Sequence, residues 1–176
     1  MRVYLDTNIL AFLVGQDKGE SISRDVMELL QDYEVVLLSS AVCFQELVHL
    51  VQIGKLRRPD CRDVGKAAAE ALQVLEDYGI KMMPVSEKHI RRLVELPLYE
   101  DHRDPNDRLI IAQAICDRIP LVSSDQKFVR YGRYGLELIF TGGNQKRFDV
   151  CGINNIRNGK RKISKVCRHG QLPSCV

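Results

Sequence analysis

Four acidic residues from well-separated parts of the chain are the strongest candidates for chemistry: Asp6, Glu46, Asp107 and Asp125. Asp6 and Asp125 each follow a short apolar run that is typical of a strand, whereas Glu46 and Asp107 fall in the early turns of predicted helices. Ligands of open α/β sheets bind in the crevice at the carboxyl ends of the strands. Folding is therefore expected to bring these four side chains to one place.

Carboxylates that converge repel one another and raise each other's pKa, and a divalent cation removes that cost. Oxygen ligands favour Mg²⁺ or Mn²⁺, and the sequence places no His or Cys beside these acids at zinc spacing. A cation of this kind lowers the pKa of a bound water and neutralises charge on a phosphate. The four acids thus predict hydrolysis of a phosphodiester by in-line attack of water.

Each acid also has a purely structural interpretation. Asp6 can end a strand in a turn, Asp107 can stabilise a helix start through the helix dipole, and Asp125 can cap the next helix. Glu46 resists such an explanation, because its neighbours are apolar and an unpaired buried carboxylate is costly. The four residues together favour a metal site over the separate structural roles.

Short apolar runs alternate along the chain with segments of helical periodicity. This alternation predicts an α/β domain with a mainly parallel central sheet. The predicted strands span residues 3–5, 35–38, 81–85, 121–122 and 136–140, and the predicted helices span residues 9–14, 23–31, 41–56, 64–78, 86–96, 105–118 and 126–131.

Local signals place the ends of several helices. Asp104 is expected at an N-cap with Pro105 at the first helical position, and Asn8 is expected to cap the helix at residues 9–14. We expect His89 to face solvent and His102 to lie in a loop.

Charge divides the 176 residues into two parts. Residues 1–141 carry more acidic than basic side chains, whereas residues 142–176 contain eight basic residues and one acid, Asp149. Helical and strand periodicity stops at Gly142, so we predict one domain over residues 1–141 and a basic, disordered tail over residues 142–176. The tail is either an arm that attracts RNA phosphates or a segment without function.

The six cysteines include no closely spaced pair in the body of the chain, and Cys43 and Cys116 lie in apolar helical stretches as expected of buried thiols. The N-terminus runs directly into a strand and does not resemble a signal peptide, and no apolar run is long enough to span a membrane. These features predict a cytoplasmic protein with free thiols and no membrane partner.

Four segments that contain the acids resemble the motifs of PIN domains, in the same order along the chain. They are residues 3–10 (VYLDTNIL), 39–47 (SSAVCFQEL), 102–114 (HRDPNDRLIIAQA) and 121–128 (LVSSDQKF). The resemblance covers residues 2–140 and is closest to the VapC-like toxins of bacterial toxin–antitoxin pairs. It departs from the usual third motif at Asn106, where an aromatic residue is common.

The resemblance implies a three-layer α/β/α sandwich and a Mg²⁺- or Mn²⁺-dependent endoribonuclease. Asp6 and Asp107 would be the most direct metal ligands, while Glu46 and Asp125 would bind metal or orient water. The resemblance also implies a homodimer and a cognate antitoxin that covers the acidic groove.

Smaller polar residues of the motifs are candidates for substrate binding. By resemblance, Thr7, Asn8 and Ser124 would hydrogen-bond the acids or the scissile phosphate of RNA. Arg108, directly after Asp107, is placed with them as a residue that contacts RNA or pairs with a carboxylate. Two alternatives stay open: a PIN nuclease of RNA maturation without an antitoxin, and a non-cleaving PIN-like module that binds RNA or protein.

Overall fold

Parallel strands form the central layer of the computed structural model, which describes residues 1–15, 22–56 and 63–141. The elements follow the order β1 (Arg2–Leu5), α1 (Thr7–Leu13), α2 (Arg24–Gln31), β2 (Val36–Ser40), α3 (Ala41–Gln52), α4 (Val64–Asp77), β3 (Lys81–Met83), α5 (Glu87–Glu95), α6 (Pro105–Asp117), β4 (Leu121–Ser123), the 3₁₀ helix η1 (Gln126–Tyr134) and β5 (Leu138–Phe140). The predicted α/β fold with a parallel sheet is confirmed.

The sheet has the strand order β3-β2-β1-β4-β5, and every pairing in it is parallel. The chain moves outward from β1 through β2 to β3 and then returns to the other side of β1 for β4 and β5. This reversal makes the carboxyl ends of β1 and β4 the topological switch point, where α/β sheets bind their ligands. Asp6 directly follows β1, and Asp125 lies two residues after β4.

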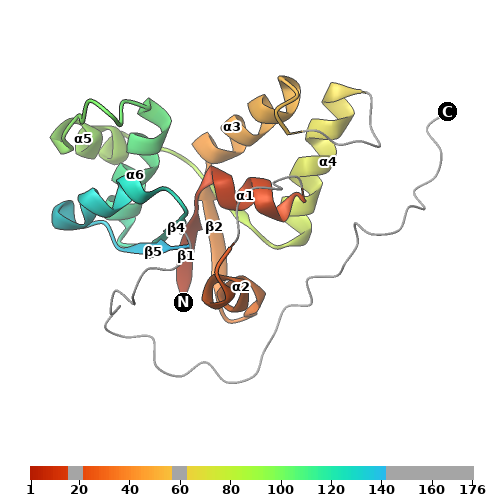
Figure 1. Ribbon diagram of the computed structural model, residues 1–176, viewed down its shortest axis with the longest axis horizontal. Helices are drawn as coiled ribbons and strands as arrows, with labels where there is room; N and C mark the ends of the chain where they lie inside the picture. The colour runs from red at the N-terminus through yellow and green to blue at the C-terminus, as the bar shows by residue number, and fades with distance from the viewer. Residues whose placement is uncertain (16–21, 57–62, 142–176) are drawn as a thin grey trace.

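Helices cover both faces of the sheet, as the predicted α/β/α sandwich requires. Helix α3 packs against α4 and α1, and α5 packs against α6, so the strands lie between the two helical groups (Figure 1). The central strands are buried on both faces: Val3, Tyr4 and Leu5 are fully buried in β1, as are Leu121 and Val122 in β4. This core fixes the two strand ends that carry the acids.

Helix α1 begins differently from the prediction. Its N-cap is Asp6, whose side chain accepts a hydrogen bond from the backbone N–H of Thr7. Asn8 lies inside the helix and donates instead to Ser124 Oγ at 2.6 Å. The assignment of Asn8 as N-cap was wrong because a tertiary hydrogen bond holds its side chain.

Other predicted boundaries hold with modest shifts. Helix α6 has Asp104 as N-cap and Pro105 in its first turn, as predicted. Helix α3 ends at Gln52, earlier than the predicted residue 56, and Gly54 then adopts a positive φ of 73°. The predicted helix at residues 126–131 is a 3₁₀ helix that continues to Tyr134.

Two predictions about burial need correction. His89 is only 3% exposed, because it faces α6 and contacts Asp117 Oδ1 through Nε2 at 3.3 Å. Cys43 is buried as predicted, whereas Cys116 is only partly buried. None of the helices in the described ranges combines the length and apolar character that a membrane span requires. The predicted tail, residues 142–176, lies outside the described residues.

Candidate active site

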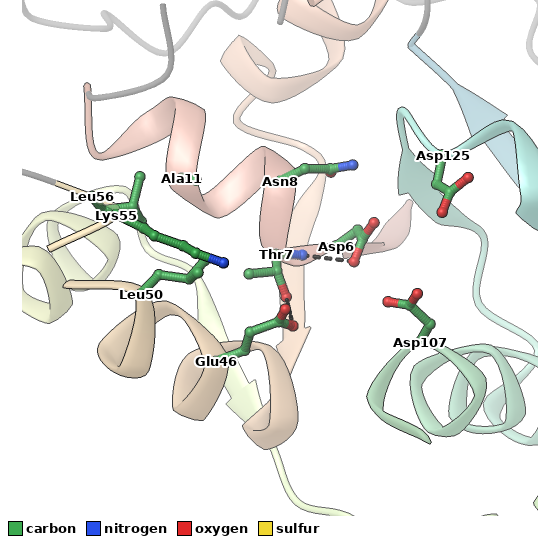
Figure 2. Close-up of a pocket in the computed structure, with 10 residues that line it drawn as sticks. All are labelled: Asp6, Thr7, Asn8, Ala11, Glu46, Leu50, Lys55, Leu56, Asp107 and Asp125. Atoms are coloured by element: carbon green, nitrogen blue, oxygen red, sulfur yellow. Dashed lines mark hydrogen bonds between the residues drawn. The ribbon is translucent and has the colours of Figure 1, made fainter. Parts of the chain in front are cut away.

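A pocket of about 330 Å³ opens at the switch point of the sheet and contains all four predicted acids. Figure 2 shows Asp107 and Asp125 facing Asp6 from one side, with Glu46 below Thr7 on the other side. The lining residues are Asp6, Thr7, Asn8, Ala11, Glu46, Leu50, Lys55, Leu56, Asp107 and Asp125. The structure therefore brings together carboxylates from the end of β1, from α3, from α6 and from the segment after β4.

Asp6 is held by hydrogen bonds to both of its carboxylate oxygens. Oδ1 accepts from the Thr7 backbone N–H at 2.7 Å, and Oδ2 accepts from Ser123 Oγ at 2.6 Å. The Ser123 hydroxyl oxygen also accepts from the backbone N–H of Asp125 at 3.0 Å, so one buried serine connects two of the acids. These contacts fix the Asp6 carboxylate at the floor of the pocket.

Glu46 and Asp125 each accept a hydrogen bond at one carboxylate oxygen. Glu46 Oε2 accepts from the Thr7 hydroxyl at 2.8 Å, and Asp125 Oδ1 accepts from the Lys127 backbone N–H at 2.8 Å as the N-cap of η1. Glu46 is partly exposed rather than buried as its apolar sequence neighbours suggested. Asp125 accordingly has both the structural role of a cap and a place in the pocket.

Burial and mutual repulsion raise the pKa values of two acids. Burial raises the pKa of Asp6 to about 6, and the charges of Glu46 and Asp125 add to the rise, while hydrogen bonds from Ser123 and Thr7 oppose it. Burial also raises the pKa of Asp107 to about 7, with further contributions from the nearby carboxylates, Asp6 first among them. The ionised forms of Asp6 and Asp107 are therefore unfavourable unless a positive charge compensates them.

His102 lies in the loop before α6, as predicted, but it also belongs to the site, which the sequence analysis did not anticipate. It is 2% exposed, and its Nε2 lies 3.2 Å from Asp107 Oδ2. Ligand atoms of His102, Asp107 and Asp125 all lie within 4.8 Å of one another. Burial lowers the pKa of His102, which favours the neutral imidazole.

The candidate substrate-binding residues are placed in different ways. Thr7 and Asn8 line the pocket, whereas Ser124 is not among the lining residues and accepts a hydrogen bond from Asn8. Arg108 points elsewhere: its Nη2 donates to the backbone carbonyls of Leu93 and Leu96, at 3.4 and 2.9 Å. Geometry therefore supports a pocket role for Thr7 and Asn8 and gives Arg108 a structural contact outside the pocket lining.

Lys55 is a pocket residue that sequence analysis did not identify. It follows α3 just after Gly54, and Figure 2 shows its ammonium group reaching into the pocket on the side of Glu46. The acidic end and the cationic end of the pocket suit a divalent cation and a phosphate, respectively. The sequence offers no signal for this placement, because it depends on where α3 ends.

The donor set fits a hard divalent cation. Four carboxylates supply oxygen ligands, and two of them have pKa values raised by burial, so a cation would relieve an unfavourable arrangement. The partly open pocket leaves space for water molecules, which Mg²⁺ retains in its coordination shell.

Comparison with known proteins identifies the family. Residues 3–134 match the family described as PIN domain, so the chain belongs to the PIN domain family. Comparison with curated proteins gives no significant match.

Solved structures share the fold at low sequence identity. VapBC2 from Rickettsia felis, solved bound to a DNA fragment from their promoter, has a TM-score of 0.57 and 19% identity over 80% of this chain and 99% of its own. VapBC-1 from nontypeable Haemophilus influenzae has a TM-score of 0.56 and 17% identity over 80% of this chain and 98% of its own. VapBC-5 from Mycobacterium tuberculosis, a member of the VapBC family of toxin-antitoxin systems, has a TM-score of 0.52 and 20% identity over 80% of this chain and 98% of its own.

Proposed function

We propose that this chain is a Mg²⁺-dependent endoribonuclease and the toxin of a toxin–antitoxin pair. The observation that carries the proposal is the convergence of Asp6, Glu46, Asp107 and Asp125 in one pocket at the switch point of a PIN fold. The fold shared with three VapBC structures supports the toxin assignment.

Each acid has a role in the proposed site. Asp6 and Asp107 bind Mg²⁺, or Mn²⁺ in its place, because their carboxylates face each other and gain most from a compensating charge. Asp125 and Glu46 either bind metal or orient water from the flanks of the pocket. The bound cation supplies a water of lowered pKa and neutralises charge on the scissile phosphate.

Neighbouring polar groups orient the substrate. Thr7 holds Glu46 through its hydroxyl, and the Asn8 amide, fixed by Ser124, faces the pocket where a phosphate oxygen would lie. In-line attack by water on phosphorus breaks the bond to the 3′ oxygen, which leaves with a proton. The products carry a 5′-phosphate and a 3′-hydroxyl.

The proposal includes protein partners. VapBC-5 is described as a member of a family of toxin–antitoxin systems, which supports a cognate antitoxin that covers the acidic pocket. A homodimer of the toxin is a further part of the proposal. Co-expression with the product of an adjacent short reading frame, followed by size-exclusion chromatography, tests both expectations. A nuclease that acts without an antitoxin would purify alone and remain active.

RNA cleavage tests the enzymatic proposal. Purified protein with Mg²⁺ is expected to cleave RNA at discrete positions, and sequencing of the ends is expected to find 5′-phosphates. The variant Asp107→Asn is expected to lose cleavage, whereas Glu28→Gln on the exposed surface of α2 should retain it. Full activity of Asp107→Asn would reject the proposed site, and Mg²⁺ binding without any cleavage would favour a non-cleaving binding module.

A further inference from the structure

The His102 imidazole lies between the acidic pocket and a layer of aromatic rings. Nδ1 lies 2.8 Å from the Tyr131 hydroxyl, and Nε2 lies 3.2 Å from Asp107 Oδ2. The ring makes edge contacts with Phe128 and Tyr131 at centroid distances of 5.6 and 5.5 Å. The imidazole is therefore packed against two aromatic rings and has one polar partner within hydrogen-bond distance of each nitrogen.

Two roles are compatible with this position. The Nε2 atom could be a metal ligand, because it lies within 4.8 Å of ligand oxygens of Asp107 and Asp125. Alternatively, Nε2–H could donate to Asp107 and orient that carboxylate. The two roles require different tautomers, since only an unprotonated nitrogen can bind a metal.

The hydrogen-bond partners decide between these tautomers. An ionised Asp107 can only accept, so the contact at Nε2 is a hydrogen bond only when Nε2 carries the proton. Nδ1 of the neutral ring must then accept, and the Tyr131 hydroxyl is its donor. The nearby Arg108 guanidinium has no acceptor atom, so it cannot compete with Nδ1 of His102 for the phenolic proton.

We propose that His102 is a positioning residue of the metal site, which donates Nε2–H to Asp107 Oδ2 and is not itself a metal ligand. This inference rests on the proposed metal-dependent function. The hydrogen bond occupies one oxygen of Asp107. The same carboxylate faces Asp6 (Figure 2), and the bond from His102 holds it in that direction. The Tyr131 hydroxyl donates to Nδ1 and thereby keeps the imidazole proton on Nε2. A chain of hydrogen bonds therefore runs from Tyr131 through His102 to Asp107.

The tautomer can be measured without any activity. Long-range ¹H–¹⁵N correlation spectra of the Mg²⁺-loaded protein, in which a metal-binding carboxylate is ionised, are expected to show His102 protonated at Nε2. Loss of the signal in a His102 variant assigns it. Protonation at Nδ1 alone would overturn the proposal. Pulsed electron paramagnetic resonance of the Mn²⁺-loaded protein should show no directly bound histidine nitrogen, and such a coupling would also overturn it.

Metal affinity provides the second test. His102→Leu removes the donor and is expected to weaken Mg²⁺ binding by roughly 10–100-fold in calorimetry, the usual effect of losing a residue that orients a ligand. His102→Gln retains an N–H donor and should recover much of that loss. Tyr131→Phe keeps the ring and removes only the hydroxyl, so it should weaken binding less than His102→Leu while leaving the protein folded.

His89 offers a matched control within the same chain. It is also a buried histidine in contact with an aspartate, Asp117, but that pair does not line the pocket. His89→Leu should lower thermal stability and leave Mg²⁺ affinity unchanged. The positioning role would be contradicted if folded His102→Leu bound Mg²⁺ as tightly as the wild type. It would also be contradicted if His102→Leu and His102→Gln lost the same amount of Mg²⁺ affinity. A wild type that binds Mg²⁺ but does not cleave RNA would reject the nuclease function and leave this role standing.

Discussion

Substitution of Asp6 by Asn is expected to raise the stability of the metal-free protein while it abolishes Mg²⁺-dependent cleavage. Asp6 is 5% exposed and lies near Glu46 and Asp125, so its ionised form is unfavourable without a cation. Asn has nearly the same shape and carries no charge. Its amide can accept from the Thr7 N–H as Asp6 does, and thus preserves the N-cap of α1.

The magnitude follows from the pKa of Asp6, which burial raises from 3.8 to about 6. One pKa unit corresponds to about 1.4 kcal/mol, so the ionised carboxylate costs at most about 3 kcal/mol of folding free energy. The Ser123 hydroxyl loses its carboxylate acceptor in the variant, which offsets part of the gain. A net gain of about 1–2 kcal/mol corresponds to an increase in Tm of roughly 2–8 °C.

The raised pKa of Asp6 also sets the direction in which stability changes with pH. Because the folded pKa of Asp6 lies above the unfolded value of 3.8, its protonation stabilises the fold below about pH 4, and this contribution is lost as the pH rises through about 6. Asn does not titrate. The stability of Asp6→Asn relative to the wild type should therefore increase between pH 4 and pH 8, whatever the fixed cost of the new amide.

Urea unfolding with a chelator at both pH values measures this difference. Asp117→Asn is a control with the opposite pKa shift. Burial raises the pKa of Asp117, but hydrogen bonds from Lys88, Tyr4 and His89 outweigh burial, so the net pKa is lowered. That variant should lose stability relative to the wild type at pH 8. A relative stability of Asp6→Asn that stays flat or falls from pH 4 to pH 8 would refute the electrostatic reasoning.

Two further substitutions test other residues of the pocket. Asp125→Asn should keep the cap of η1 but weaken Mg²⁺ binding. Asp125→Ala should weaken Mg²⁺ binding and also lose about 1 kcal/mol of stability, because it removes the cap. Equal Mg²⁺ affinity in the wild type and both variants would exclude Asp125 from the site. Lys55→Met should weaken RNA binding and reduce the dependence of that binding on salt, without changing Mg²⁺ affinity. Filter binding at several salt concentrations measures both effects on RNA. Unchanged RNA binding would show that Lys55 does not contact the RNA.

The parts of the fold that follow from local patterns were predictable. Asp104 and Pro105 mark the start of α6 because capping and the fixed φ of proline act within one helical turn. The buried strands β1 and β4 appear as apolar runs because both of their faces are covered. The four acids were predictable from their positions after strands and near helix starts, since parallel strands direct these positions to one edge.

The residues that support the acids were not predictable in the same way. His102 contacts Tyr131, 29 positions away, and Asn8 contacts Ser124, 116 positions away. No periodicity or capping rule encodes contacts at such separations. Ser123 had a weak signal, because it directly follows the predicted strand and precedes the predicted acid Asp125 by two residues, but its bond to Asp6 depends on the pairing of β1 with β4.

A crystal structure of the Mn²⁺-loaded protein, with anomalous scattering recorded for manganese, tests the central claim most directly. The expected result is an anomalous peak in the pocket within roughly 2–2.5 Å of carboxylate oxygens of Asp6 and Asp107. The same experiment on Asp6→Asn should show a weaker peak or none. Saturating Mn²⁺ that leaves the pocket without a peak, or that binds only at other acids, would contradict the assignment of these carboxylates as a divalent metal site.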